Sequence, residues 1–252
     1  MCTYRNLGLK SEWLKIFFED PSFFSLNARL GKDMIQSFKL WGKDAELLNA
    51  KYLPMPCVAR LVNLGVDSLK VWGYLFVNLA YNSNLMNFFV KGCRFNEWYD
   101  NATLVKIFDD GKSLRTKQGA VRALKSFLRY SPVGNEMGQG NFSFSGKNIV
   151  GVMRTPWQNP EPLVILYSLY RFVAHVDNLF SFTLSELLDD ERERAALSPQ
   201  ALFGLDKNIL RPLLQGLATN YFSFISVDFN KGLMENIFLN PSKTAHDVVN
   251  LF

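Results

Sequence analysis

The stretch from residue 111 to residue 153 changes from a helical to a strand-like pattern, and this change constrains the fold more than any other feature. Between Val121 and Leu128, apolar residues recur at the spacing of one helix face and predict a buried stripe. The later segment NFSFSG alternates apolar and polar residues among Gly and Asn, which predicts a β-hairpin. The sequence therefore predicts a helix that packs on a core and is followed by a hairpin.

The predicted helix is strongly basic. Residues 111–130 contain six Lys or Arg and no acidic residue. Cations recur at helical spacing beside the apolar stripe, which predicts a surface that binds a polyanion such as DNA. An ordinary solvated basic face is the alternative. The residues predicted to contact DNA from this segment are Arg115, Lys117, Arg122, Lys125 and Arg129.

Charge is distributed unevenly along the 252 residues. Residues 1–70 and 71–150 have excesses of three and five positive charges, whereas residues 151–252 have an excess of three negative charges. Hydrophobic residues make up 48% of the chain, which excludes a disordered protein. The middle of the chain thus carries the strongest positive field, within a folded protein.

Each third of the chain has helical patterns followed by a strand-rich tail. The order helix, helix, helix, hairpin is typical of a winged helix, in which the third helix enters the major groove of DNA. The sequence predicts a mainly α protein with short β-hairpins (α+β), built from tandem winged-helix-like units at 1–66, 67–157 and 158–252. The second unit would contain the basic recognition helix, and the acidic third unit is expected to contact proteins.

Two further sets of residues extend this interpretation. Residues 32–48 predict an amphipathic helix whose polar side adds Lys32, Gln36 and Lys39 as DNA contacts. The third unit is rich in aromatic residues, which we expect in its core, with a homo-oligomer surface as the alternative. These aromatic residues are Tyr167, Tyr170, Phe172, Tyr221, Phe222 and Phe224.

Candidates for catalysis are weak. The spacing of the two histidines and three cysteines matches no zinc motif, so no metal ligand set is identified. The carboxylate candidates are Glu12, Asp20 and the pair Asp109 and Asp110. That pair lies near Lys112, a grouping that binds Mg²⁺ in some nucleases, although an ordinary turn at a helix end is the alternative. The sequence has no apolar run of membrane-spanning length and no secretory signal, so we expect a cytoplasmic protein.

Four segments resemble a known bacterial family. They are WLKIFFEDPSFF, GKDMIQSFKLW, VWGYLFVNLAY and SLRTKQGAVRALKSFLRYSP, in this order. The most specific parts are Trp13-Leu14-Lys15 and Gly31-Lys32-Asp33-Met34 with Trp41 downstream. The chain resembles, over most of its length, the family of DNA phosphorothioation-associated proteins that includes SspB.

The resemblance implies a DNA-binding protein of an anti-phage defence system. Such a protein acts with a cysteine desulfurase, an ATP-using sulfur-transfer enzyme and an ATPase, and it nicks or opens one strand of double-stranded DNA so that sulfur can be incorporated. A nuclease of this kind would use Mg²⁺ or Mn²⁺. A non-enzymatic adaptor that recruits the modification enzymes to DNA, and a winged-helix transcriptional regulator, are the alternatives.

Two segments depart from the family pattern. The family's first motif opens with a His, whereas this chain begins Cys2-Thr3-Tyr4-Arg5. A Gly-rich turn precedes the Lys in the family, whereas residues 28–31 read Ala-Arg-Leu-Gly here. If either feature is catalytic in the family, this chain is altered as a nickase.

Overall fold

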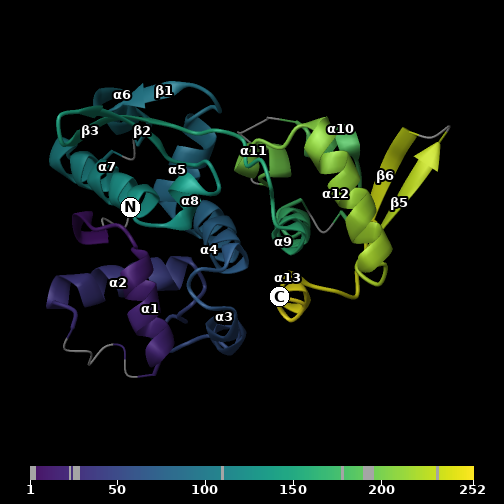
Figure 1. Ribbon diagram of the computed structural model, residues 1–252, viewed down its shortest axis with the longest axis horizontal. Helices are drawn as coiled ribbons and strands as arrows, with labels where there is room; N and C mark the ends of the chain where they lie inside the picture. The colour runs from purple at the N-terminus through teal and green to yellow at the C-terminus, as the bar shows by residue number, and fades with distance from the viewer. Residues whose placement is uncertain are drawn as a thin grey trace. The chain divides into compact units, whose positions relative to one another are not determined.

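The computed structural model describes residues 4–22, 24, 29–108, 111–176, 179–189, 196–230 and 233–252. It is mainly helical with two small antiparallel sheets of three strands each, which confirms the predicted α+β class (Figure 1). The chain divides into two compact units, 1–156 and 157–252. The predicted segments 1–66 and 67–157 lie almost wholly within the first, so the finer division into three stays a prediction. Among the described helices, none is long and apolar enough to cross a membrane.

The first unit begins with four helical segments. The rings of Phe17 on α1 and Phe38 on α2 are both buried and pack against each other, with centroids 5.0 Å apart. The two prolines and the β-branched residues of 52–63 predict a loop and short strand, but a helix begins at Val58 because Val58 and Leu61 share a buried face. The segments are η1 (Tyr4–Asn6), α1 (Ser11–Glu19), α2 (Lys32–Asp44) and α3 (Val58–Leu64).

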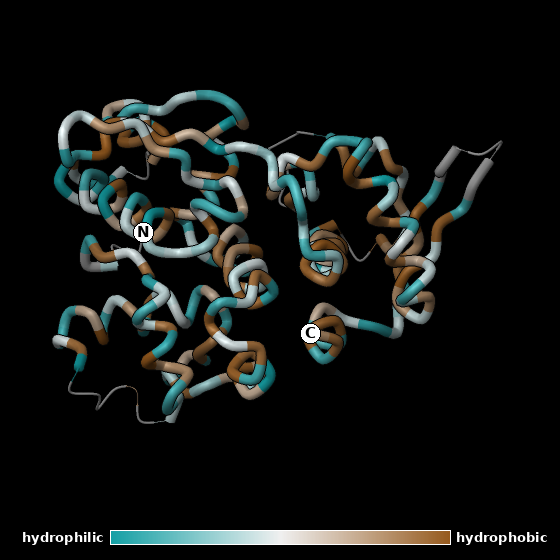
Figure 2. The backbone as a smooth tube through the Cα atoms, viewed as in Figure 1, coloured by the Kyte–Doolittle hydropathy of each residue, from teal (hydrophilic) through white to brown (hydrophobic). Residues whose placement is uncertain are grey.

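The helix α4 (Leu69–Asn82) is the centre of the first unit. All ten residues from Val71 to Ala80 are buried, as its almost unbroken apolar sequence predicts. Figure 2 shows hydrophobic residues along most of its length. The buried amide of Asn78 donates a hydrogen bond of 3.2 Å to the Ala45 carbonyl, so the polar group is satisfied. The next helix, α5 (Asn84–Gly92), packs against α4.

The segment before α1 packs between α2 and α7 (Leu114–Arg129). The Tyr4 ring stacks on Trp41 with a centroid distance of 3.9 Å, and Trp41 stacks on Phe127 at 5.1 Å. A Cβ atom added at Gly8 would lie 2.1 Å from the Phe127 backbone nitrogen, so the chain passes directly over α7. This close approach holds the apolar side of α7 against the segment that precedes α1.

The carboxyl of Asp44 lies at the end of this packed segment. Tyr4 donates a hydrogen bond of 2.5 Å to it, while burial, the larger effect, raises its pKa above the ordinary value of 3.8. As pH rises above 3.8, the unfolded carboxyl ionises while the folded one retains its proton, so stability falls across this window. The buried charge then lowers stability at neutral pH.

Replacing Asp44 with asparagine should remove this pH dependence. The amide oxygen still accepts the hydrogen bond from Tyr4 but has no charge to bury. The variant should therefore gain stability relative to wild type as pH rises from about 4 to about 7. Urea unfolding across this range measures the difference, and a constant difference would contradict the raised pKa.

The second half of the first unit contains the predicted hairpin. Its sheet has the order β1-β3-β2, and all pairs are antiparallel. Asn96 precedes Glu97 and a periodic apolar run, a pattern that predicts a helix cap. Instead it has a φ of 63° and precedes a strand, and Asp100 caps the helix by accepting a bond of 2.7 Å from the Thr103 N–H. Beyond α7, the elements are β1 (Trp98–Asp100), α6 (Asn101–Ile107), α8 (Pro132–Asn135), β2 (Asn141–Ser145) and β3 (Asn148–Met153).

Arg154, directly after β3, is a buried cation. Its side chain is 0% exposed and donates to the Gln139 side chain at 2.9 Å and to the carbonyls of Val90 and Cys93 at 2.9 and 3.2 Å. The guanidinium also lies 4.1 Å from the Phe95 ring centroid. Arg154 therefore joins the end of α5 to the end of the sheet.

The second unit is built around the apolar helix α9 (Pro162–Val173), which Figure 2 shows as mostly hydrophobic. Four of the six aromatic residues predicted for its core are buried, whereas Phe222 is 80% exposed. A capping box of Thr183 and Glu186 begins α10, as its sequence predicts. The other elements are β4 (Ser181–Thr183), α10 (Leu184–Leu187), α11 (Pro199–Phe203), α12 (Lys207–Asn220), β5 (Ile225–Asn230), β6 (Leu233–Leu239) and α13 (Ala245–Val249).

The two sheets have the same topology. In each, a strand of three residues leads directly into a helix and pairs with the last strand of a later hairpin. In β2 the register shifts after Ser143, the partner of Gly151; in β5 it shifts after Asp228, the partner of Asn236. Gly151 and Asn236 also pair with the last residues of β1 and β4. Segments 84–153 and 162–239 thus repeat one arrangement of helices and strands.

Candidate nucleic-acid interface

The basic helix predicted from the sequence is α7. It begins after Ser113, whose side chain accepts a hydrogen bond of 3.3 Å from the Thr116 N–H. The residues on one side of the helix are small or apolar and are buried, as the apolar stripe predicts. These buried residues are Gly119, Ala120, Val121, Ala123, Leu124, Phe127 and Leu128.

The opposite side of α7 has a line of exposed polar residues. Arg115, Gln118, Arg122 and Arg129 follow one another at helical spacing, and each is exposed. We call these four residues the arginine line. It extends for about 21 Å, at 1.5 Å per residue, which is close to the length of six base pairs. The sequence predicted its three arginines, while Gln118 was missed because it has no charge.

Lys125 lies on the same side of α7 but forms hydrogen bonds within the protein. Its ammonium donates to the Asn101 side chain at 2.9 Å and to the Ile149 carbonyl at 3.0 Å. Burial, followed by the nearby charge of Arg122, lowers its pKa from 10.5. Lys125 therefore connects α6, α7 and β3. Lys117, the remaining predicted contact on α7, is half-buried and lies outside the arginine line.

A shallow cavity of about 230 Å³ lies where α6 faces α7. Arg122 and Gln118 of the arginine line open onto it, with Asn101 on the α6 side. Its surface thus combines a guanidinium with two side-chain amides, the groups that proteins use to bind phosphate oxygens and base edges.

The end of α7 carries aromatic rings beside cations. The Arg129 guanidinium lies 5.5 Å from the Tyr130 ring centroid and 5.9 Å from that of Phe144, on the hairpin strand β2. The Lys10 ammonium lies 4.6 Å from the Tyr130 ring. We call Lys10, Arg129, Tyr130 and Phe144 the aromatic–cation cluster. Sequence reasoning missed it as a group because its members come from three separate segments.

The other predicted DNA contacts lie on α2. Lys32 is exposed at the first position of the helix, and Gln36 is half-buried. Lys39 is also half-buried, and its ammonium lies 5.7 Å from the Tyr52 ring centroid. These residues belong to a helix different from the arginine line.

The carboxylate candidates do not form a site in the described structure. Glu12 is exposed in the first turn of α1, and Asp20 is exposed directly after its end. Between them, Glu19 forms an ion pair with Arg29, which lowers the pKa of the Glu19 carboxyl. Asp109 and Asp110 lie outside the described residues.

A search of the described side chains finds no group of three or more His, Cys, Asp or Glu that could hold a metal ion.

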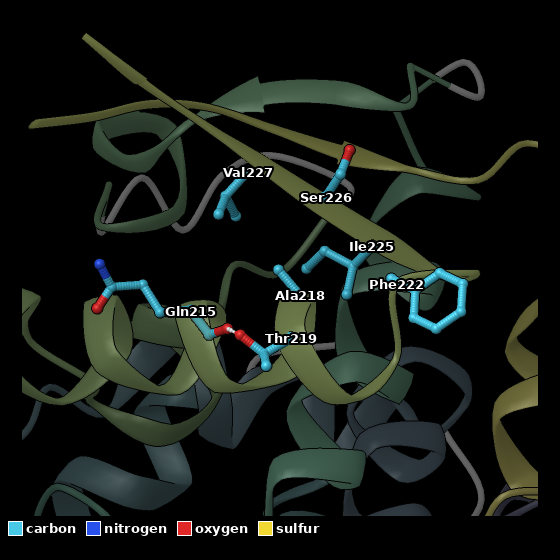
Figure 3. A pocket seen from close by; sticks show the side chains of 7 residues that line it. All are labelled: Gln215, Ala218, Thr219, Phe222, Ile225, Ser226 and Val227. Carbon is cyan, nitrogen blue, oxygen red and sulfur yellow. Dashed lines mark hydrogen bonds between the residues drawn. The ribbon is translucent and has the colours of Figure 1, made fainter. Parts of the chain in front are cut away.

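The second unit also has a long helix before its hairpin, α12. This helix carries the cations Lys207 and Arg211 toward its start, whereas Gln215 and Thr219 lie toward its end. A pocket of about 430 Å³ lies between α12 and β5, bordered by the exposed ring of Phe222 (Figure 3). The Thr219 hydroxyl donates to the Gln215 carbonyl at 3.0 Å within this pocket. The pocket beside α12 is thus lined by uncharged residues, whereas the cavity beside α7 includes Arg122 and Lys125.

Comparison with known proteins relates this arrangement to one solved structure. No protein-family model and no curated protein matches the sequence. The magnesium ion-bound SspB crystal structure matches 99% of this chain and 86% of its own, with a TM-score of 0.71 and 12% sequence identity. The chain has the fold of SspB. The resemblance inferred from the sequence is thereby confirmed at the level of the fold. The magnesium ion belongs to that SspB structure.

Proposed function

We propose that this chain is a DNA-binding component of a bacterial DNA phosphorothioation defence system and that α7 contacts the duplex. The observation that carries the proposal is the arginine line, an exposed row of cations on a helix that precedes a hairpin. The likeness to SspB supports a component of a phosphorothioation system.

We infer further that residues 84–153 form a winged helix. Apart from the four-residue helix α8, a helix, a short strand, two helices and a hairpin follow in the order that such units have, with α7 in the position of the recognition helix. Lys147 is exposed at the hairpin tip, where a wing contacts the DNA backbone. Residues 162–239 repeat the arrangement and are proposed as a second winged helix.

Removing the three arginines of the line should weaken DNA binding and its dependence on salt. Each phosphate contact contributes roughly 0.9 to the slope of log affinity against log salt, so Arg115→Ala, Arg122→Ala and Arg129→Ala together should reduce the slope by about 2.7. Titration of a labelled duplex between about 50 and 200 mM salt measures this. Lys125 is left intact because it connects three elements.

A matched triple variant controls for net charge. Lys43, Lys51 and Arg60 are exposed cations of the same unit outside α7. Their replacement with alanine removes the same charge. It should leave most of the slope of log affinity against log salt unchanged. If the two triple variants lowered affinity and slope equally, the arginine line would not be the DNA-binding surface.

Nicking and recruitment are separated with supercoiled plasmid. Purified protein is incubated with Mg²⁺, Mn²⁺ or EDTA, and products are resolved on native and denaturing gels. Metal-dependent open circles that disappear in Asp109→Asn and Asp110→Asn would support a nicking enzyme, with Glu12 and Asp20 as the next positions to test. Retarded plasmid without nicks would support an adaptor, whose acidic second unit we propose as the surface for the sulfur-transfer enzyme or the ATPase.

A further inference from the structure

We propose that the aromatic–cation cluster binds an unpaired base next to duplex DNA. This inference rests on the proposed function, because Arg129 belongs both to the arginine line and to the cluster. A protein that held a duplex along the line would place the cluster at the end of the contacted segment. The preferred ligand is then DNA with a junction between paired and unpaired nucleotides.

The exposure of the two rings is the first observation. Tyr130 is 47% exposed and Phe144 is 55% exposed, whereas Phe142, two residues earlier in β2, is half-buried. The ring centroids of Phe142 and Phe144 are 6.3 Å apart. The apolar side of the hairpin thus continues past the core and ends in a ring that faces solvent.

The positions of the cations are the second observation. Lys10 and Arg129 both lie near the Tyr130 ring, and Arg129 also lies near Phe144, at the distances given above. Aromatic faces beside cations are the arrangement with which proteins bind single-stranded nucleic acid, because bases stack on the rings while phosphates meet the charges. Paired bases inside a duplex are already stacked and cannot use such rings. The cluster therefore favours unpaired nucleotides.

The backbone around both rings is held in place. The Tyr130 carbonyl accepts two hydrogen bonds from Ser11, at 3.0 Å from its N–H and 3.1 Å from its hydroxyl. Phe144 follows the register shift after Ser143, which changes how the strand presents its side chains. A ring carried on fixed backbone loses little conformational freedom when it binds a base.

The test compares a blunt duplex with the same duplex carrying a single-stranded thymine overhang. Wild-type protein should bind the overhang form roughly tenfold more tightly for each base that stacks. The double variant Tyr130→Leu and Phe144→Leu keeps apolar side chains without aromatic faces. It should lose the preference for the overhang and keep the affinity for the blunt duplex.

Two controls make the result specific. Trp98, an aromatic residue 54% exposed on the opposite edge strand β1, should be replaceable by leucine without loss of the preference. The Tyr130→Phe variant keeps the aromatic ring and should retain the preference for the overhang. Thermal unfolding of each variant confirms that the first unit is folded.

The other outcomes overturn specific statements. Equal binding of both forms by wild-type protein would overturn the inference and leave the proposed function intact, since the blunt duplex reports that function alone. An overhang preference that persists in the double variant would assign unpaired bases to another surface. Failure of wild-type protein to bind either form would overturn both.

Discussion

Replacing Trp41 with alanine is expected to lower the free energy of unfolding of the first unit by about 3–5 kcal/mol. The side chain is 0% exposed and stacks between Tyr4 and Phe127, so its removal leaves a large cavity where three segments meet. Its indole N–H also donates to the Leu7 carbonyl at 2.8 Å; this bond would be lost, although the carbonyl keeps the bond of 3.0 Å from the Ser37 hydroxyl. Urea unfolding monitored by circular dichroism measures the change.

The Trp98→Ala variant is the matched control for this prediction. It removes the same side chain from a half-exposed position on an edge strand, where little packing is lost. We expect its destabilisation to be much smaller than that of Trp41→Ala. Equal effects of the two substitutions would show that Trp41 does not join α2 to α7.

Replacing Arg154 with methionine is expected to lower the free energy of unfolding by at least about 3 kcal/mol, because three buried acceptors each lose the hydrogen bond that its guanidinium donates, at about 1–3 kcal/mol each. Methionine has a similar length and fills part of the space, which isolates the loss of hydrogen bonds. The acceptors are the Gln139 side chain and the carbonyls of Val90 and Cys93. The same urea measurement applies.

The Arg154→Lys variant separates charge from geometry. Lysine retains the positive charge but lacks the planar fork that reaches several acceptors at once. It should recover only part of the lost stability. Full recovery would mean that the charge alone, in contact with the rings of Phe89 and Phe95, accounts for the effect.

Much of the fold could be predicted from local patterns. The buried helix α4, the amphipathic helix α7 and the two hairpins follow from the period of their apolar residues, which depends on neighbours in sequence. Strand β1 could not be predicted in this way. Its three residues form a strand only because β3 lies beside them, and β3 follows some fifty residues later in the chain.

The same difference between local patterns and contacts of distant residues applies to the candidate interface. The arginines of α7 were found because they recur on one helix face. The hydrogen bonds of the Lys125 ammonium were not found, because its partners Asn101 and Ile149 are each 24 residues away. For the same reason sequence patterns did not place Lys10 over the ring of Tyr130.

Lys125 forms hydrogen bonds within the protein, whereas its neighbours in the arginine line are exposed. This difference affects how the surface can change during evolution. Substitutions at Arg115, Gln118, Arg122 or Arg129 alter exposed side chains and leave the packing of α7 intact. A substitution at Lys125 breaks a connection between three elements. Natural variants should therefore be able to change the arginine line, and with it the proposed DNA binding, while a lysine persists at position 125. The proposed function could then be adjusted without endangering the fold.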